Sequence, residues 1–235
     1  MRLSIDSFDN LIFLESDYVS VISIQSVHYY AKIVRSFFFE CNGMDGETEI
    51  ALIDDKEKRL SISSGIEFIA DPLLIDFSSK RLSTALIGLL KQELNNDVEV
   101  RMDIEEALRK AQRKVVSLID DFDLPIKYDD AWDATKMIKA TAISIDDNVE
   151  GLTHLEILKR YIQVVSELKV NSYFCFAGLN NILTEEEIIE FYKESLQRQV
   201  GLICIQHDNT CPNPNKYACT TFIDDDFDEH IINPI

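Results

Sequence analysis

A short acidic segment, residues 120–133, carries the side chains best suited to bind a metal ion. Six aspartates lie within 14 residues, with one lysine among them: Asp120, Asp121, Asp123, Asp129, Asp130 and Asp133. Carboxylates this close repel one another unless a cation neutralises them, and Ca²⁺ accepts many oxygen ligands in irregular geometry. The spacing of an EF-hand loop is missing, so the segment predicts a calcium site of another kind. A solvated acidic turn around Pro125 is the more ordinary interpretation of the residues alone, and it stays open.

A row of basic side chains points to a different chemistry, the binding of phosphates. The candidate nucleic-acid contacts are Arg101, Arg109, Lys110, Arg113, Lys114, Lys159 and Arg160. At about 100° per residue, the four cations of residues 109–114 cover roughly 140° of a helix. The apolar side chains Leu108, Ala111 and Val115 lie nearly opposite, on a face that we expect to be buried. Such a row can line a nucleic-acid backbone without reading its sequence. The alternative is an ordinary solvated helix face, paired with Glu105 and Glu106.

Four residues in the C-terminal part of the chain are of the types that bind zinc. They are Cys204, His207, Cys211 and Cys219. Their spacing is irregular, and Cys204 lies inside an apolar strand pattern, whereas a structural zinc needs four ligands directed at one centre. One core cysteine and two loop cysteines are the favoured interpretation. The acidic run 224–229 is interpreted as a solvated tail or edge, with a role as a cation ligand as the alternative.

No motif of a known catalytic class is present. The phosphate loop G-x-x-x-x-G-K-[ST], the dinucleotide fingerprint G-x-G-x-x-G and the nucleophile elbow G-x-S-x-G are all missing. The four histidines, at positions 28, 154, 207 and 230, form no recognisable spacing with a nucleophile and an orienting group. We therefore predict that the protein is not an enzyme.

Composition narrows the class of protein further. The chain has 235 residues, of which 46% are hydrophobic, so it can bury a normal core. Its net charge of −19 argues against a simple basic nucleic-acid binder and for solubility, cation binding or a sharply segregated surface. No apolar run is long enough to cross a bilayer, and Asp6 interrupts any signal-peptide pattern, so we expect a cytoplasmic protein that does not bind membranes. Its five cysteines fit reduced thiols.

The elements that must position these side chains alternate between strands and helices. In the first 80 residues, short strand patterns at 11–14, 19–22, 49–53, 60–62 and 66–69 surround one helix at 27–38, with Ser26 as its cap. Residues 82–94, 104–119 and 155–165 show helical spacing of apolar residues, and a short helix is expected near 131–140. The basic row and the acidic segment therefore both belong to a mainly helical region.

The clearest pattern follows residue 169. A buried strand at 173–177, a capping box at Thr184–Glu187, a helix and a second strand at 200–205 form a βαβ unit. Both strands are apolar throughout, as parallel strands covered on both faces must be. We predict an α/β head made from residues 1–80 and 169–235 with a mainly parallel sheet, and an inserted α-helical leg made from residues 81–168.

The chain resembles the short form of the type II-A CRISPR-associated Csn-two family, which are non-enzymatic adaptation proteins. The likeness lies in the opening strand 1–5, the leucine-rich helix 82–90, the segment from Tyr173 to Ile205, and the closing run 222–227. The resemblance implies a head like a degenerate P-loop or RecA-like core without the phosphate loop. The family's calcium ligands lie near the junction of head and leg, which corresponds here to residues 120–133.

The same resemblance implies how the protein would act. It implies a calcium-stabilised homotetrameric ring that encircles double-stranded DNA from free ends during spacer acquisition. Its partners would be the CRISPR integrase complex and the RNA-guided nuclease. Four subunits would carry 4 × −19 = −76 charges, so binding DNA requires cations inside the ring and acids outside or neutralised by metal. The alternatives are a nucleotide-handling P-loop-like protein and an acidic protein-interaction scaffold without DNA binding.

Overall fold

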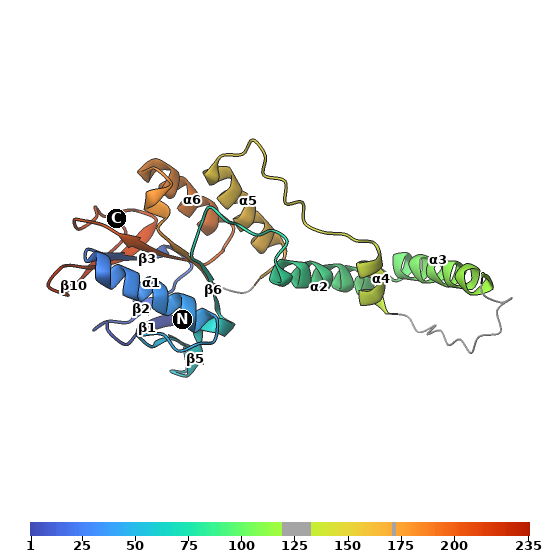
Figure 1. Cartoon of the computed structure of the whole chain (residues 1–235), viewed down its shortest axis with the longest axis horizontal. Coiled ribbons are helices and arrows are strands. Elements are labelled where there is room, and N and C mark those ends of the chain that lie inside the picture. The colour runs from blue at the N-terminus through green and yellow to red at the C-terminus, as the bar shows by residue number, and fades with distance from the viewer. Residues whose placement is uncertain (119–132, 171–172) are drawn as a thin grey trace. The chain divides into compact units, whose positions relative to one another are not determined.

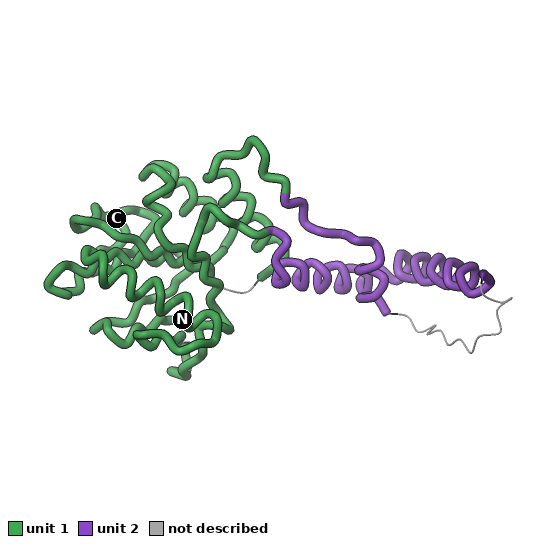
Figure 2. The backbone as a smooth tube through the Cα atoms, viewed as in Figure 1, with its two compact units in different colours: residues 1–76, 148–235 green, residues 77–147 purple. Residues whose placement is uncertain are grey.

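The computed structural model describes residues 1–118, 133–170 and 173–235 (Figure 1). The chain forms two compact units, residues 1–76 with 148–235 (unit 1) and residues 77–147 (unit 2) (Figure 2). The described α-helices are α1 (Val27–Cys41), α2 (Lys80–Asn96), α3 (Val98–Ser117), α4 (Ala134–Ala140), α5 (His154–Glu167) and α6 (Glu185–Gln197). The described strands are β1 (Arg2–Ile5), β2 (Ile12–Phe13), β3 (Val19–Ile24), β4 (Ile50–Ile53), β5 (Arg59–Ser61), β6 (Ile66–Ile69), β7 (Tyr173–Ala177), β8 (Leu202–His207), β9 (Ala218–Ile223) and β10 (Glu229–Ile232).

A six-stranded sheet in the order β10-β9-β3-β8-β7-β6 organises unit 1. All its neighbouring strands pair in parallel except β10, which is antiparallel to β9. In the centre, Ile22 of β3 lies opposite Ile205 of β8 and Thr221 of β9. The expected mainly parallel sheet is confirmed. Strand β9 lies on the far side of β3 from β8, so the segment 208–217 that joins β8 to β9 crosses over β3.

Helix α1 and one face of this sheet share a large apolar core. Ile33 and Phe37 of α1 are fully buried in a cluster that also contains Ile22, Cys175 and Ile203. The predicted cap is present, because the Ser26 hydroxyl accepts a hydrogen bond from the Tyr29 backbone N–H at 3.5 Å. The helix therefore begins where its sequence predicts and is held there by packing against the sheet.

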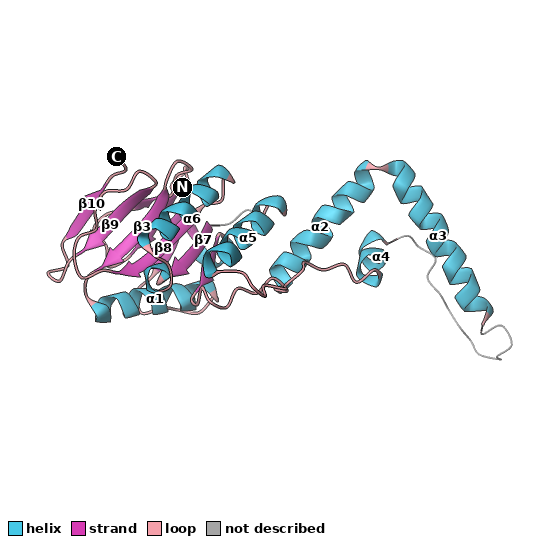
Figure 3. Ribbon diagram, turned by 90° about the horizontal axis from the view of Figure 1, so that it is seen from above, coloured by secondary structure: helices cyan, strands magenta, loops and turns pink. Residues whose placement is uncertain are grey.

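Helices α5 and α6 run side by side along the opposite face of the sheet (Figure 3). The Tyr161 ring of α5 meets Phe174 edge-on with centroids 5.6 Å apart, and Phe191 of α6 meets Phe176 at 5.5 Å. Phe174 and Phe176 alternate with Cys175, which faces α1, so β7 is buried on both faces as predicted for a parallel strand. Helix α5, which was expected in the leg, belongs to unit 1 through these aromatic contacts.

A second, antiparallel sheet was not predicted. Its four strands follow the order β2-β1-β4-β5. Leu3 and Leu52, on paired positions of β1 and β4, are buried in the same core as α1. The short strand patterns of the first 80 residues therefore belong mostly to this sheet, and only β3 and β6 join the parallel one.

Unit 2 contains helices α2, α3 and α4. Asp97 both ends α2 and caps α3, because its carboxylate accepts a hydrogen bond from the Val100 N–H at 3.0 Å. The short helix α4 packs against α2 and buries Ala134 and Ile138. The expected short helix near residues 131–140 is confirmed. None of the described helices is long and apolar enough to cross a membrane.

Candidate nucleic-acid interface

The C-terminal half of α3 presents the predicted basic row to solvent. Arg109, Lys110, Arg113 and Lys114 are all exposed, and Arg101 is half-buried about two turns earlier. The Arg109 guanidinium donates to Glu105 Oε1 at 2.8 Å, and Arg113 Nε donates to the Arg109 carbonyl at 3.3 Å. Lys110 and Lys114 form no ion pair with any described residue. Two of the four cations in the row thus have no ion-pair partner in the part of the chain that the structure describes.

The opposite face of α3 differs from the expectation. Leu108, Ala111 and Val115 were expected to be buried, yet no residue of α3 is buried and the Val115 side chain is 63% exposed. The reason lies within unit 2, where α4 packs against α2 and gives α3 no comparable cover. The predicted helix is confirmed, but the predicted burial of its apolar face is wrong for the single chain.

The second pair of candidate cations has local partners. Lys159 Nζ donates to Glu190 Oε1, which ties α5 to α6. Arg160 Nη1 donates to the Asn148 carbonyl at 2.6 Å. Both residues belong to unit 1, whereas the row of residues 109–114 belongs to unit 2. Contacts within unit 1 therefore already engage both side chains.

The acidic segment lies mostly outside the described residues. This applies to Asp120, Asp121, Asp123, Asp129 and Asp130. Asp133 is described, and it is the N-cap of α4: its Oδ1 accepts hydrogen bonds from the N–H groups of Thr135 at 2.8 Å and Lys136 at 3.1 Å. Both capping bonds use this one oxygen, so capping leaves Oδ2 able to accept from another group.

The zinc candidates do not converge. The Cys204 side chain faces α6, where it meets the Tyr192 hydroxyl, and His207 Nε2 lies 3.0 Å from the Gln25 carbonyl. Cys211 is exposed on the segment after β8. Within the described ranges, no three His, Cys, Asp or Glu side chains form a group that could hold a metal ion.

The buried thiols are poor nucleophiles. Burial raises the pKa of Cys204 to about 12 and also raises the pKa of Cys175 well above its usual value. A reactive cysteine needs the opposite, a lowered pKa beside a cation or a helix N-terminus. These two side chains therefore act as small core residues.

The connection from β3 to α1 is too short to cradle a phosphate. Strand β3 ends at Ile24 and α1 begins at Val27, so only Gln25 and Ser26 lie between them. A phosphate loop needs several successive backbone N–H groups in a glycine-rich turn, and the Ser26 hydroxyl instead caps the helix. The first parallel strand and its helix are present without the loop that binds nucleotides.

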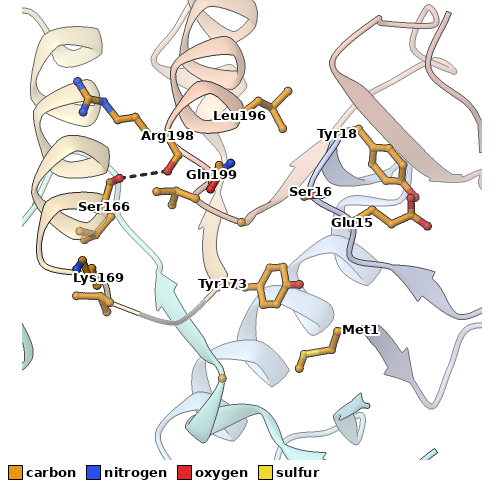
Figure 4. Close-up of a pocket in the computed structure, with 15 residues that line it drawn as sticks. Met1, Glu15, Ser16, Tyr18, Ser166, Lys169, Tyr173, Leu196, Arg198 and Gln199 are labelled. Atoms are coloured by element: carbon orange, nitrogen blue, oxygen red, sulfur yellow. Dashed lines mark hydrogen bonds between the residues drawn. The ribbon is translucent and has the colours of Figure 1, made fainter. Parts of the chain in front are cut away.

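A cavity of about 570 Å³ lies at the amino ends of β7 and β8 (Figure 4). The Tyr173 ring covers Gly201, where a Cβ would lie 2.4 Å from the ring, so only glycine fits there. The Ser166 hydroxyl donates to the Arg198 carbonyl at 3.1 Å, and burial raises the pKa of Tyr18 to about 12. In α/β sheets ligands bind at the carboxyl ends of the strands, and the Arg198 guanidinium is already paired with Glu194. We therefore assign no ligand to this cavity.

Comparison with known proteins decides the family. Residues 43–227 match the family model described as CRISPR-associated protein (Cas_Csn2), which covers well over half of the chain. The chain belongs to the Cas_Csn2 family. The predicted resemblance is thus confirmed, and family membership implies a role in CRISPR adaptation alongside its machinery. No curated protein sequence matches the chain significantly.

The sequence patterns gave no sign of one polar cluster in this Cas_Csn2 protein. It lies at the carboxyl end of β8, where Asp208 accepts hydrogen bonds from Ser23, Asn180 and Gln206. In the sequence, this polar cluster is marked only by the change from the apolar strand 202–205 to the polar residues 206–210. Ser23 comes from β3 and Asn180 from the segment before α6, so only the fold brings these two partners to Asp208.

Proposed function

We propose that this Cas_Csn2 protein is a non-catalytic, calcium-dependent ring that holds double-stranded DNA without sequence preference during spacer acquisition. The observation that carries the proposal is the exposed row of residues 109–114 on α3, in which Lys110 and Lys114 have no acidic partner among the described residues. An exposed linear array of cations is the chemistry that a phosphate backbone requires.

Charge is sharply segregated along α3. Its acidic side chains all lie in the first half, Glu99 to Glu106, whereas residues 107–117 contain four cations and no acid. Cations near a helix C-terminus also interact favourably with the helix dipole. The second half of the helix is therefore strongly positive on a chain whose net charge is −19.

That local charge can overcome the repulsion between two polyanions. Acids farther than about 8 Å from the DNA are screened at physiological salt. Cations at contact distance release counterions, which gives affinity without reading bases. Backbone contacts alone carry no sequence information, so the proposed interface fits a clamp that accepts any duplex.

Calcium fits the chemistry of the acidic segment. Carboxylate oxygens are the ligands that Ca²⁺ prefers, and Asp133 keeps one carboxylate oxygen beyond its capping bonds. We assign Asp120, Asp121, Asp123, Asp129, Asp130 and Asp133 as candidate ligands. Calcium held there would lower the negative charge near the basic helix, and the aspartates would supply the oxygens.

We further infer that unit 1 is a degenerate P-loop or RecA-like core that has lost catalysis. The support is a parallel sheet in which a helix follows β3 directly, with a two-residue connection in place of a phosphate loop. A nucleotide-handling role is disfavoured by the same feature. The ring is proposed to be a homotetramer that works with the CRISPR integrase complex and the RNA-guided nuclease.

Charge reversal tests the DNA-binding row. The variant Lys110→Glu/Lys114→Glu should lose most of its affinity for a linear duplex in calcium, measured by fluorescence anisotropy. Its dependence on salt should also weaken, by a slope of about 0.9 for each phosphate that the variant no longer neutralises. The matched control is Lys56→Glu/Lys58→Glu, which reverses two exposed lysines of unit 1 and should bind like the wild type. Equal affinity of all three proteins would favour the acidic scaffold without DNA binding.

A further inference from the structure

A second cavity lies in unit 1 between α6 and the segment 208–217. It measures about 510 Å³, a size that accepts a small molecule. Val21 of β3 and Thr220 of β9 line it from the sheet, and Ile188 and Tyr192 line it from α6. It reaches the carboxyl end of β8, the edge of an α/β sheet where ligands commonly bind.

One of the side chains that line this cavity is the carboxylate of Asp208. Its Oδ2 accepts hydrogen bonds from the Ser23 hydroxyl at 2.6 Å and the Gln206 amide at 2.7 Å. Its Oδ1 accepts one from Asn180 Nδ2 at 3.2 Å. Three neutral donors from different parts of the chain thus fix the carboxylate in place.

No positively charged side chain of a described residue is paired with this carboxylate. Asp208 forms no ion pair within the part of the chain that the structure describes, and the charged side chains that line the cavity are Asp208 and Glu185. The Asn180 Oδ1 atom is buried and accepts no hydrogen bond from a described residue. A partly buried charge without a charged partner is costly, and the site has an excess of acceptors and negative charge. A phosphate-bearing ligand would be repelled.

Part of the remaining lining is apolar, beside amide and hydroxyl side chains. Leu183, Ile188 and Ile189 present aliphatic side chains to the same space. A ligand that matches both features carries ammonium groups on a methylene chain, because each ammonium supplies three donors and the methylenes can pack on aliphatic surface. We infer that this cavity binds an aliphatic polyamine, with one ammonium at Asp208 and another toward Glu185. This inference does not depend on DNA binding.

Calorimetric titration with spermidine tests the inference. The wild-type protein should show saturable binding at one site per chain, and Asp208→Asn should weaken it at least tenfold while keeping the shape of the side chain. The control Asp225→Asn removes the same charge from an exposed turn and should leave binding unchanged. An uncharged diol of similar length should give no heat.

Other outcomes are equally decisive. Equal weakening by Asp208→Asn and Asp225→Asn would overturn the inference, because spermidine would then respond only to net charge. Binding of N-acetyl-lysine amide without binding of spermidine would also overturn it, in favour of a lysine side chain from a protein partner. If Asp208→Asn does not fold by circular dichroism, Glu185→Gln takes its place. That variant should weaken spermidine binding several-fold, and unchanged binding would contradict the inference.

Discussion

The four cations of residues 109–114 differ in what they contact. Arg109 is paired with Glu105 at 2.8 Å, but its side chain is 60% exposed. An exposed ion pair of this kind contributes at most about 1 kcal/mol. Arg109 can therefore exchange Glu105 for a phosphate at little cost, whereas Lys110 and Lys114 have no acid to exchange among the described residues.

A single substitution should reveal this competition. Replacing Glu105 by Gln removes the acid that competes with phosphate for Arg109, so affinity for duplex DNA should rise roughly 1.5- to 5-fold, the range that an exposed pair allows. Fluorescence anisotropy at fixed salt measures it. The control Glu47→Gln breaks a similar exposed pair with Arg35, at 3.1 Å in unit 1, and should not change affinity. Weaker binding by Glu105→Gln would show that Arg109 does not meet the DNA.

At the scale of elements, hydrogen bonds at the helix N-termini fix where α5 and α6 begin. Thr184 and Glu187 form a capping box at α6, and Thr153 and Glu156 form another at α5. The Thr184 backbone N–H, and then its hydroxyl, lower the pKa of Glu187 below its ordinary value of 4.5. A carboxyl whose folded pKa is lowered stabilises the protein above its unfolded pKa, and this stabilisation is lost as pH falls through the folded value.

The capping box predicts a pH dependence of stability. Glu187→Ala should lower the melting temperature at pH 7, and the difference from the wild type should shrink as pH falls below about 4.5. Thermal melts followed by circular dichroism measure both effects. Glu186→Ala removes a neighbouring acid that makes no capping bond and should have the smaller effect. A difference that stays constant down to acid pH would contradict the assigned role of the carboxylate.

Helix α4 offers a way to separate capping from metal binding. Asn replaces Asp well as an N-cap but carries no charge, whereas Ala removes the cap at a cost of about 1 kcal/mol. In chelator, Asp133→Ala should therefore have a lower melting temperature than the wild type, and Asp133→Asn should have the same melting temperature as the wild type. In calcium, both variants should lose part of the metal-linked stabilisation, which is about 2.7 kcal/mol at a hundredfold excess over Kd. If Asp133→Asn responds fully to calcium, Asp133 is a cap and no ligand.

At the scale of the whole molecule, the negative charge of the chains opposes their assembly into a ring. A tetramer would carry 4 × −19 = −76 charges, and divalent ions that reduce this repulsion favour assembly. Each chain also leaves apolar side chains of α3, such as Val115, open to solvent. A closed assembly would cover this apolar face, and divalent ions would reduce the repulsion between its chains.

Assembly mass should therefore depend on calcium. Sedimentation or light scattering in calcium should give about four times 27.0 kDa, and the particle should dissociate in chelator as repulsion returns. The variant Asp129→Asn/Asp130→Asn should need more calcium to assemble, whereas Asp225→Asn/Asp226→Asn, with the same loss of charge in an exposed turn, should not. A monomer under both conditions would exclude the ring.

Local sequence patterns predicted most of the helices and strands, but they could not predict which distant strands pair in the sheets. The β7–α6–β8 unit, its capping box and α1 were predicted because their signals lie within a few neighbouring residues. The antiparallel sheet was missed because the pairing of β1 with β4 joins residues far apart in sequence, and so was the position of β9 beside β3. The exposed basic row was predicted from the helical spacing of residues 109–114 alone. The ion pair of Lys159 with Glu190 could not be predicted, since it depends on how α5 packs against α6.

The most direct test compares linear duplex DNA with covalently closed circular DNA of the same sequence, in calcium and at physiological salt. We expect retention on linear DNA, little retention on closed circles, and release of the linear DNA when a chelator is added. We also expect that Lys110→Glu/Lys114→Glu retains neither form. Equal retention of linear and closed DNA, or retention that persists in chelator, would contradict a calcium-dependent ring that loads from free ends.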